Sequence, residues 1–220
     1  MRRGSFRFLW MVLLAVPVLA AFRGGWAVIT VEELPDHASV GEPLALEFTV
    51  RQHGIEPMRD LTPVVEATAA GKTARVRAAA GSKSGLYTAT VIPPAAGDLK
   101  IHIASSFGNS DVTLQPIHTH PAGRKSLPLT DFERGRRLFV AKGCVTCHVH
   151  AEFKGRTLAE VGPELTDRRY TADFLSKWLA EPPKTPTRGT FPMPDLDLDA
   201  REIASLTAFI NVERGRHALK

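Results

Sequence analysis

The hydrophobic pattern of this 220-residue chain changes its period once, and this change limits the folds open to it. Up to residue 117 apolar residues tend to alternate with polar ones, which is the period of half-buried strands. After residue 129 apolar residues recur at the spacing of an amphipathic helix. The residues between, 118–129, follow neither period and hold Pro121, Gly123 and Pro128, so they are read as a linker. The chain therefore divides into two domains of different class.

The first domain, residues 24–117, is expected to be all-β. In the run 44–51, Leu, Leu, Phe and Val occupy every second position, and similar runs follow, separated by turn-forming residues. About seven short strands in roughly ninety residues favour an immunoglobulin-like sandwich. Neither cysteine of the chain lies in this domain, so no disulfide is expected to link its sheets.

The second domain, residues 130–220, is expected to be small and all-α. Thr130 and Glu133 have the spacing of a capping box, which predicts that a helix begins there. Further helices are expected over residues 171–179 and 199–213, with a proline-rich stretch between them. This domain has too few apolar residues for a large core of its own, so a bound prosthetic group would complete it. Each domain is expected to make mostly internal contacts.

Residues 1–23 have the pattern of an export signal. Basic residues at Arg2, Arg3 and Arg7 precede an uncharged apolar run over residues 8–22, and Ala20 is suited to cleavage. The run is short for a spanning helix, although an uncleaved membrane anchor stays an alternative. Either interpretation places the folded domains in the periplasm or elsewhere outside the cytoplasm, with the chain soluble or attached to the inner membrane.

The charge distribution argues against nucleic acid as a partner. The formal net charge is +5, and residues 1–25 contribute four arginines and no acid to it. Residues 26–117 hold 7 Lys and Arg against 10 Asp and Glu, and residues 118–220 hold 17 against 13. The chain without its N-terminal segment is thus close to neutral, and it lacks the basic surface that nucleic acid requires.

The two cysteines stand in the pentapeptide Cys144-Val145-Thr146-Cys147-His148, which is the attachment signature of c-type haem. Two intervening residues let both thiols reach the two vinyl groups of one haem, and the adjacent imidazole can then bind its iron. A structural zinc site would need a second pair of ligands. A thioredoxin-like pair would follow a strand, whereas Cys144 follows a predicted helix that ends at Gly143. One covalent haem c, attached through Cys144 and Cys147, is therefore expected.

The region from residue 129 to residue 216 resembles class I cytochrome c. Gly135 and Phe139 resemble the pair with which the family's first helix packs against its last. Gly162-Pro163-Glu164-Leu165 is similar to the family's Gly-Pro-x-Leu segment. The resemblance implies that the carbonyl of Pro163 accepts a hydrogen bond from the His148 imidazole and that Leu165 packs on the haem face.

Met193 is the expected sixth ligand, opposite His148. The segment Phe191-Pro192-Met193-Pro194 resembles the family's axial-methionine loop, and prolines on both sides restrict the backbone. A thioether sulfur is a soft ligand that favours Fe(II) and raises the reduction potential. His150 is a rival ligand, but it lies so close to His148 that it is interpreted as a solvated side chain. Contacts of haem propionates are a further hypothesis for three residues: Arg169, Tyr170 and Trp178.

With His148 and Met193 both on the iron, small molecules are excluded and only an electron passes. The expected function is therefore one-electron transfer, without enzymatic activity, to or from a larger respiratory complex such as a membrane oxidase or reductase. An enzyme or gas sensor with a displaceable sixth ligand is the alternative of a different class.

The role of the β domain is open from its sequence. His53 and Met58 lie close together in an expected loop and, with His37 or His102, would suit copper. A copper-binding or copper-delivery protein with a redox-coupled haem domain is therefore a second alternative. His118 and His120 form a His-x-His pair in the linker that is interpreted as solvated. A module that docks on a membrane complex fits the β domain equally well.

Overall fold

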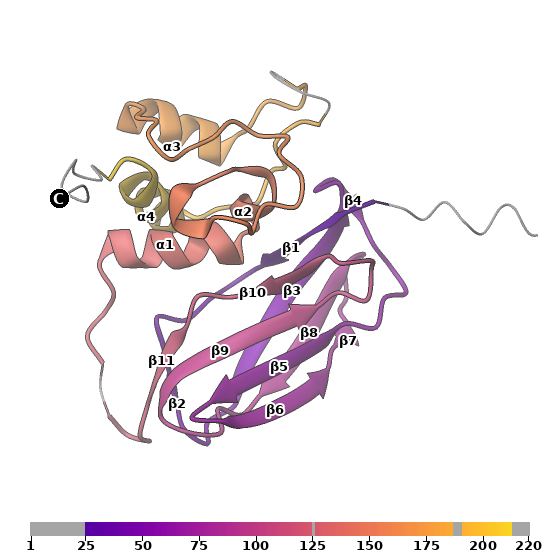
Figure 1. Cartoon of the computed structure of the whole chain (residues 1–220), viewed down its shortest axis with the longest axis vertical. Coiled ribbons are helices and arrows are strands. Elements are labelled where there is room, and N and C mark those ends of the chain that lie inside the picture. Colours follow the sequence, from indigo (N-terminus) through magenta and orange to yellow (C-terminus); the bar gives the residue numbers. More distant parts are fainter. Residues whose placement is uncertain (1–24, 125, 187–190, 213–220) are drawn as a thin grey trace, which may run out of the picture.

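The computed structural model describes residues 25–124, 126–186 and 191–212. These residues form two domains, with the helices gathered at one end of a β-sandwich (Figure 1). The order of the domains agrees with the prediction. The expected export signal, residues 1–23, lies outside the described residues. None of the described helices is long and apolar enough to cross a membrane.

The first sheet of the sandwich is antiparallel, and five strands belong to it among the described residues. Its order is β1-β3-β8-β7, and β4 pairs with the end of β3. Its strands are β1 (Ala27–Val31), β3 (Leu44–Gln52), β4 (Glu56–Pro57), β7 (Ala79–Ala80) and β8 (Leu86–Val91). Strand β1 is buried along its whole length, so both of its faces are covered.

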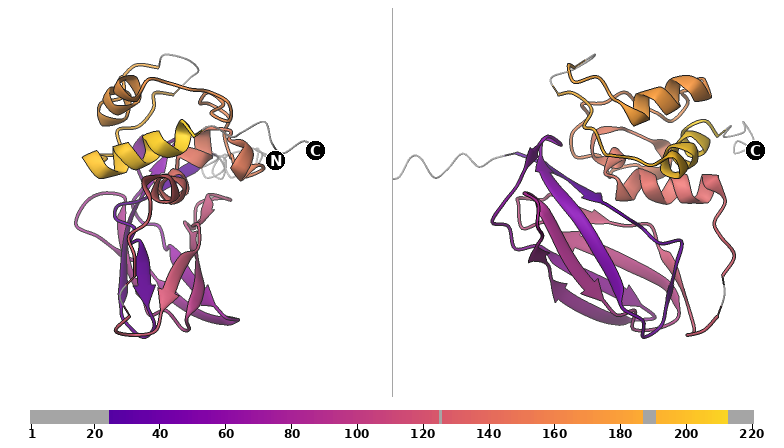
Figure 2. Two further views of the ribbon diagram at one scale, coloured as in Figure 1. Left: turned by 90° about the vertical axis from the view of Figure 1, so that its left-hand side faces the viewer. Right: turned by 180° about the vertical axis from the view of Figure 1, so that it is seen from behind.

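The second sheet has six strands within the described part of the chain, in the order β2-β11-β9-β5-β6, with β10 also paired to β9. Its strands are β2 (His37–Ser39), β5 (Val64–Ala69), β6 (Lys72–Arg77), β9 (Gly97–Ala104), β10 (Asp111–Thr113) and β11 (Ile117–His120). On β5 and β9 every second residue is fully buried between the sheets, as at Val65 and Ile101. The left view of Figure 2 shows the two layers. The period-2 pattern thus gave a β-sandwich, as predicted.

The linker is shorter than the sequence indicated. His118 and His120 belong to strand β11, which pairs antiparallel with β9 and parallel with β2. Residues 118–120 of β11 fall in the predicted linker because so short a strand shows almost no period. His120 is half-buried rather than solvated, whereas His118 is exposed.

The helical domain begins with α1 (Asp131–Ala141), and its N-terminus has the predicted capping box. The Thr130 hydroxyl accepts a hydrogen bond from the Glu133 amide, and the Glu133 carboxylate accepts one from the Thr130 amide. These bonds satisfy two amides that a helix N-terminus leaves without partners. After α2 (Cys144–Cys147) and the 3₁₀ turn η1 (Ala151–Phe153) follow α3 (Ala172–Ala180) and α4 (Ala200–Ile210).

Helices α1 and α4 cross in close contact, as the sequence predicted from Gly135 and Phe139. A Cβ added at Gly135 would lie 1.9 Å from the carbonyl oxygen of Ser205, so the two backbones touch there. The rings of Phe139 and Phe209 are fully buried, with centroids 5.4 Å apart. Glycine is therefore required at position 135 by the backbone of α4.

The two domains share an extensive polar contact, which the expectation of mostly internal contacts did not anticipate. Arg134 of α1 is buried, and its guanidinium donates two hydrogen bonds to the Asp36 carboxylate, one of them 2.7 Å long. Arg137 donates to the Asp36 carbonyl at 2.6 Å. Lys142, at the end of α1 and 2% exposed, donates to the carbonyl of Glu32 and pairs with Glu202 of α4. The end of the sandwich and helix α1 are thus held together by buried cations.

Replacing Asp36 by asparagine should destabilise the folded protein by about 1–2 kcal/mol. A fully buried pair costs ~3–5 kcal/mol to break, but the Asp36 side chain keeps 20% exposure to solvent, which reduces the loss. Chemical unfolding of the purified protein measures the difference. As a control, Glu66→Gln breaks the exposed pair with Arg75 and should change stability by less than ~1 kcal/mol.

The cost of Asp36→Asn should also depend on pH. Burial acts to raise the pKa of Asp36, but hydrogen bonds from Arg134 and from the Leu129 amide, with the Arg134 charge, outweigh it and lower the pKa. Because the folded-state pKa lies below the unfolded value, the stabilisation is complete above the unfolded pKa and is lost as pH falls through the folded one. The stability gap between wild type and variant should therefore narrow below about pH 4. A gap that is constant down to pH 3 would contradict the ion-pair account.

Candidate functional site

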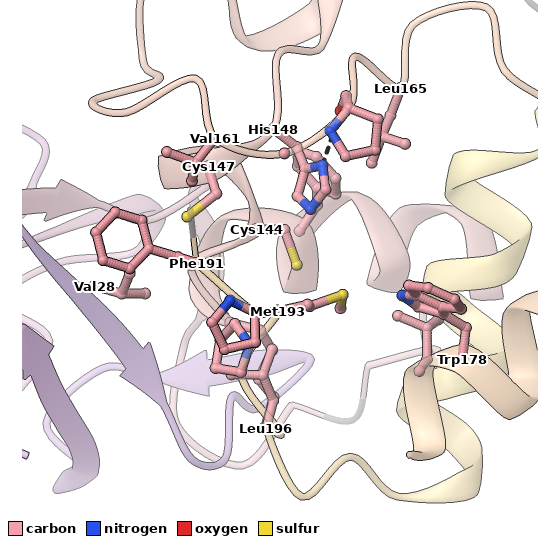
Figure 3. Close-up of a pocket in the computed structure, with 18 of the residues that line it drawn as sticks. Val28, Cys144, Cys147, His148, Val161, Leu165, Trp178, Phe191, Met193 and Leu196 are labelled. Atoms are coloured by element: carbon pink, nitrogen blue, oxygen red, sulfur yellow. Dashed lines mark hydrogen bonds between the residues drawn. The ribbon is translucent and has the colours of Figure 1, made fainter. Parts of the chain in front are cut away.

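The two cysteines lie on one helical turn directly after α1. Gly143, between α1 and α2, has φ +81°, a left-handed conformation that lets the chain turn sharply at the end of α1. The single turn of α2 then carries Cys144 and Cys147, whose sulfurs both face the same cavity (Figure 3). The spacing of two residues between the cysteines therefore produces a pair of thiols on one wall.

Both cysteines are free thiols in the structure. Burial raises the pKa of Cys144 to about 12, and burial raises that of Cys147 to about 11. At neutral pH both sulfurs are thus protonated and uncharged. A redox-active Cys-x-x-Cys pair has the opposite property, a lowered thiol pKa. The environment disfavours the thioredoxin-like interpretation and leaves two neutral thiols facing an apolar space.

A hydrogen bond fixes the orientation and the tautomer of the His148 imidazole. Its Nδ1 lies 2.8 Å from the carbonyl oxygen of Pro163, and because a carbonyl only accepts, Nδ1 carries the proton and donates. The other ring nitrogen, Nε2, is left with its lone pair available. Burial lowers the pKa of His148 and outweighs this hydrogen bond, which acts to raise it. The lowered pKa favours the neutral imidazole, which is the form that binds metals.

Gly162 allows the Pro163 segment to approach the imidazole. A Cβ at position 162 would lie 2.5 Å from Cε1 of His148, which is too close for any side chain to fit. The segment is also tied to the haem motif through its backbone, since the Gly162 amide donates to the Cys147 carbonyl at 3.0 Å. The Leu165 amide donates to the Val149 carbonyl, and the buried Leu165 side chain lines the cavity.

Met193 reaches the same cavity from the segment that precedes α4. The residue is partly buried, and its thioether side chain points into the space below Cys144 in the view of Figure 3, whereas His148 lies above. Pro192 and Pro194 also line the cavity. The structure thus brings all six expected site residues to one place: Cys144, Cys147, His148, Pro163, Leu165 and Met193.

The cavity has a volume of about 360 Å³. This value lies in the range of about 300–1,000 Å³ that is typical of pockets for small organic ligands. Its walls are mainly apolar, and besides the thiols, the imidazole and the thioether of the expected site they include polar side chains such as His53, Lys142 and Arg168. Two neutral thiols, an imidazole with a fixed tautomer and a soft sulfur ligand around an apolar space are the groups that bind a c-type haem. The residues present therefore fit this cofactor.

The interpretation of His150 as a solvated side chain is wrong. His150 is 1% exposed and lies among aromatic rings, with centroids 5.1 Å from Phe139 and 4.8 Å from Phe209. It is not among the residues that line the cavity. The sequence shows that His150 follows His148 by two residues, but not which way its side chain points. In the structure the chain turns His150 towards the crossing of α1 and α4.

Of the three residues considered for propionate contacts, Tyr170 and Trp178 line the cavity. Arg169 does not, and its guanidinium instead donates to the carbonyl of Arg168. Arg168 itself lies on the cavity wall. The sequence could not distinguish the two adjacent arginines, because the segment before α3 has no regular period.

The β domain contributes three residues to the cavity wall that the sequence gave no reason to place there: Trp26, Val28 and His53. The sequence suggests a role for His53 only as a copper ligand, together with Met58. In the structure the His53 ring lies 4.9 Å from the Phe191 ring, tilted by 30°, whereas Met58 packs against the apolar core of the sandwich.

The structure lends no support to a copper site. His37, His118 and His120 have neighbouring rings, at centroid distances of 5.1 and 4.5 Å from His120. His102 lies apart from them, beside Asp111 and Thr113. Within residues 25–124, 126–186 and 191–212, no group of three or more His, Cys, Asp or Glu residues is arranged to hold a metal ion.

Comparison with known families agrees with the geometry. Residues 132–212 match the family model for cytochrome c. The C-terminal domain is therefore a cytochrome c domain, and it follows an immunoglobulin-like β domain. Such a domain implies haem c, and the spacing of Cys144, Cys147 and His148 fits its attachment. The match covers residues 132–212 only, and it supports an electron carrier with a c-type haem.

Several solved structures are distantly similar to the chain. They include the Lin-41 filamin domain (14% identity, 43% of this chain and 91% of that chain, TM-score 0.32). The Escherichia coli adhesin FdeC is 23% identical over 44% of this chain and 32% of that chain, with a TM-score of 0.31. The superoxide reductase of Ignicoccus hospitalis is 14% identical over 42% of this chain and 80% of that chain, with a TM-score of 0.29. No curated protein matches the sequence. These likenesses carry no conclusion about function.

Proposed function

We propose that this protein is an extracytoplasmic c-type cytochrome that transfers single electrons through one haem c. Cys144 and Cys147 would hold the haem covalently, and His148 and Met193 would bind its iron. The observation that carries this proposal is the single apolar cavity in which both thiols, the imidazole and the thioether meet. When bound, haem supplies an iron that cycles between Fe(III) and Fe(II).

The chain's own residues determine the properties of this site. The hydrogen bond from His148 to the Pro163 carbonyl fixes the ring and makes it a stronger electron donor. The soft sulfur of Met193 favours Fe(II) and so raises the reduction potential. The mainly apolar walls would limit the access of water to the iron, which further favours the less charged, reduced state.

Electron transfer is a better fit to this arrangement than catalysis. With His148 and Met193 both binding the iron, a substrate would have to displace one of these side chains. An electron needs no such displacement. The proposed role is therefore that of a carrier or subunit that serves a larger respiratory complex, for example a membrane oxidase or reductase.

The proposed location rests on the N-terminal segment and on the cofactor. Haem c is typical of extracytoplasmic proteins, and the basic and apolar pattern of residues 1–23 is suited to export. The folded domains are accordingly proposed to lie in the periplasm, either free or held at the inner membrane by this segment.

Covalent attachment provides the direct test. Protein produced together with a cytochrome c maturation system should keep its haem on a denaturing gel, because thioether bonds survive denaturation. The double variant Cys144→Ala and Cys147→Ala should lose the haem stain completely. The control is Thr146→Ser, which leaves the motif intact and should stain like wild type. Haem that acid and organic solvent extract from the wild type would refute the proposal.

A further inference from the structure

The β domain forms part of the wall of the haem cavity. Two of its segments reach the cavity: Trp26 and Val28, at the start of β1, and His53, in the turn that follows β3. On the helical side they meet the segment that carries Met193. The contact therefore joins residues more than 130 positions apart in the chain.

Three rings form the first part of this contact. The His53 ring lies 4.9 Å from Phe191 and 5.4 Å from Trp26, and Trp26 lies edge-on to Phe191 at 5.8 Å. These distances are those of favourable aromatic pairs. Each ring thus contacts the other two, and Phe191 stands only two residues before Met193.

The second part of the contact lies on the other side of Met193. A Cβ added at Gly54 would lie 3.6 Å from the Pro194 ring and 3.5 Å from the Val28 side chain, so the turn backbone packs close to Pro194. Phe191 and Pro194 are both held by the β domain, and Met193 stands between them. The backbone of the Met193 segment is thus restrained from both ends.

The turn that makes these contacts is itself rigidly fixed. His53 has φ +54°, a left-handed conformation that is uncommon for a residue with a side chain. The turn keeps this conformation because β4 pairs back onto β3 and because the His53 amide donates to the Trp26 carbonyl at 3.0 Å. Backbone strain of this kind persists only where the surroundings enforce it, and it is frequent at functional positions.

Strand β1 connects the contact to the haem-attachment motif. A Cβ at Gly143, the residue before Cys144, would lie 2.3 Å from the Val28 side chain and 3.0 Å from the Ile29 carbonyl. The side chain of Val28 therefore approaches both Gly143 and Gly54. The attachment motif and the Met193 segment are positioned against the same strand of the β domain.

We propose that the β domain is a positioning element for the sixth ligand: Trp26, Val28, His53 and Gly54 hold the segment Phe191–Pro194 so that Met193 stays in the cavity. This inference rests on the proposed function, in which Met193 binds the iron. It gives the β domain a role that needs no ligand of its own. It also makes the closure of the sixth position dependent on the contact between the domains.

The test is carbon monoxide binding to the reduced full-length protein, since carbon monoxide binds only where Met193 has left the iron. Trp26→Ala removes one ring pair with the Met193 segment, the pair with Phe191, so it should raise the open fraction about two- to tenfold. His53→Ala should act in the same direction. Trp26→Phe, which keeps an aromatic ring, should restore most of the closed state. The sulfur-to-iron absorption band of the oxidised protein should weaken in parallel.

The matched control is Val65→Ala, in the core of the sandwich. Val65 is fully buried, so this variant destabilises the β domain without touching the cavity. It should leave carbon monoxide binding and the absorption band unchanged. Equal opening in Val65→Ala and Trp26→Ala, or no opening in Trp26→Ala, would overturn the positioning role. A wild-type protein that lacks the band would instead refute Met193 as ligand, and with it the proposed function.

Discussion

Replacing Met193 by alanine should lower the reduction potential on the order of 100 mV or more, the scale on which axial ligands set haem potentials. The thioether stabilises Fe(II), and alanine offers no ligand in its place. The oxidised protein should lose its sulfur-to-iron charge-transfer band, and the reduced protein should begin to bind carbon monoxide. A redox titration followed by absorbance, with spectra at neutral pH, measures all three changes.

Met58→Ala is the control for this prediction. Met58 lies in the β domain, where its side chain packs against the apolar core and its carbonyl accepts a hydrogen bond from Tyr87 at 2.8 Å. The variant should keep the potential, the band and the closed sixth position. If Met193→Ala keeps them as well, another residue holds the iron. His150 is then a poor candidate, since its ring is enclosed between α1 and α4.

Replacing Gly135 by alanine should destabilise the protein by about 2 kcal/mol, although alanine is the better helix former. Helix propensity alone predicts a gain of about 1 kcal/mol at an interior glycine. The added Cβ, however, would lie 1.9 Å from the Ser205 carbonyl oxygen and 2.9 Å from the Cβ of Phe209. Backbone atoms cannot rotate away as a side chain can, so α1 and α4 must separate, and the overpacking cost exceeds the gain in propensity.

Helix propensity and overpacking predict changes of opposite sign in the stability of Gly135→Ala, so the measurement distinguishes them. Thermal or urea unfolding of the haem-loaded protein should give a lower midpoint for Gly135→Ala. Lys177→Ala, at an exposed position of α3, should change stability by no more than ~0.5 kcal/mol. A midpoint for Gly135→Ala at or above that of the wild type would mean that the helices do not cross as closely as described.

Much of the candidate site could be predicted from the sequence because its determinants are local. The cysteine spacing places two thiols on one helical turn, and the capping box at Thr130 fixes the start of α1 within a few residues. The hydrogen bond from His148 to the carbonyl of Pro163, 15 residues further on, is expected from the resemblance to cytochrome c and is present in the structure. The two periods of the apolar pattern were likewise sufficient for the order of the domains.

Only the tertiary structure decided how the two domains meet. Asp36 and Arg134 are 98 residues apart, and nothing near either residue indicates the other. The same holds for Trp26, His53 and Phe191, which come together only when the turn after β3 and the segment before α4 are both in place. A hydrophobic pattern records which face of an element is buried, but not which distant surface buries it. For this reason the sequence determined the haem-binding motif of this protein, whereas tertiary packing decided that the β domain forms a wall of the haem cavity.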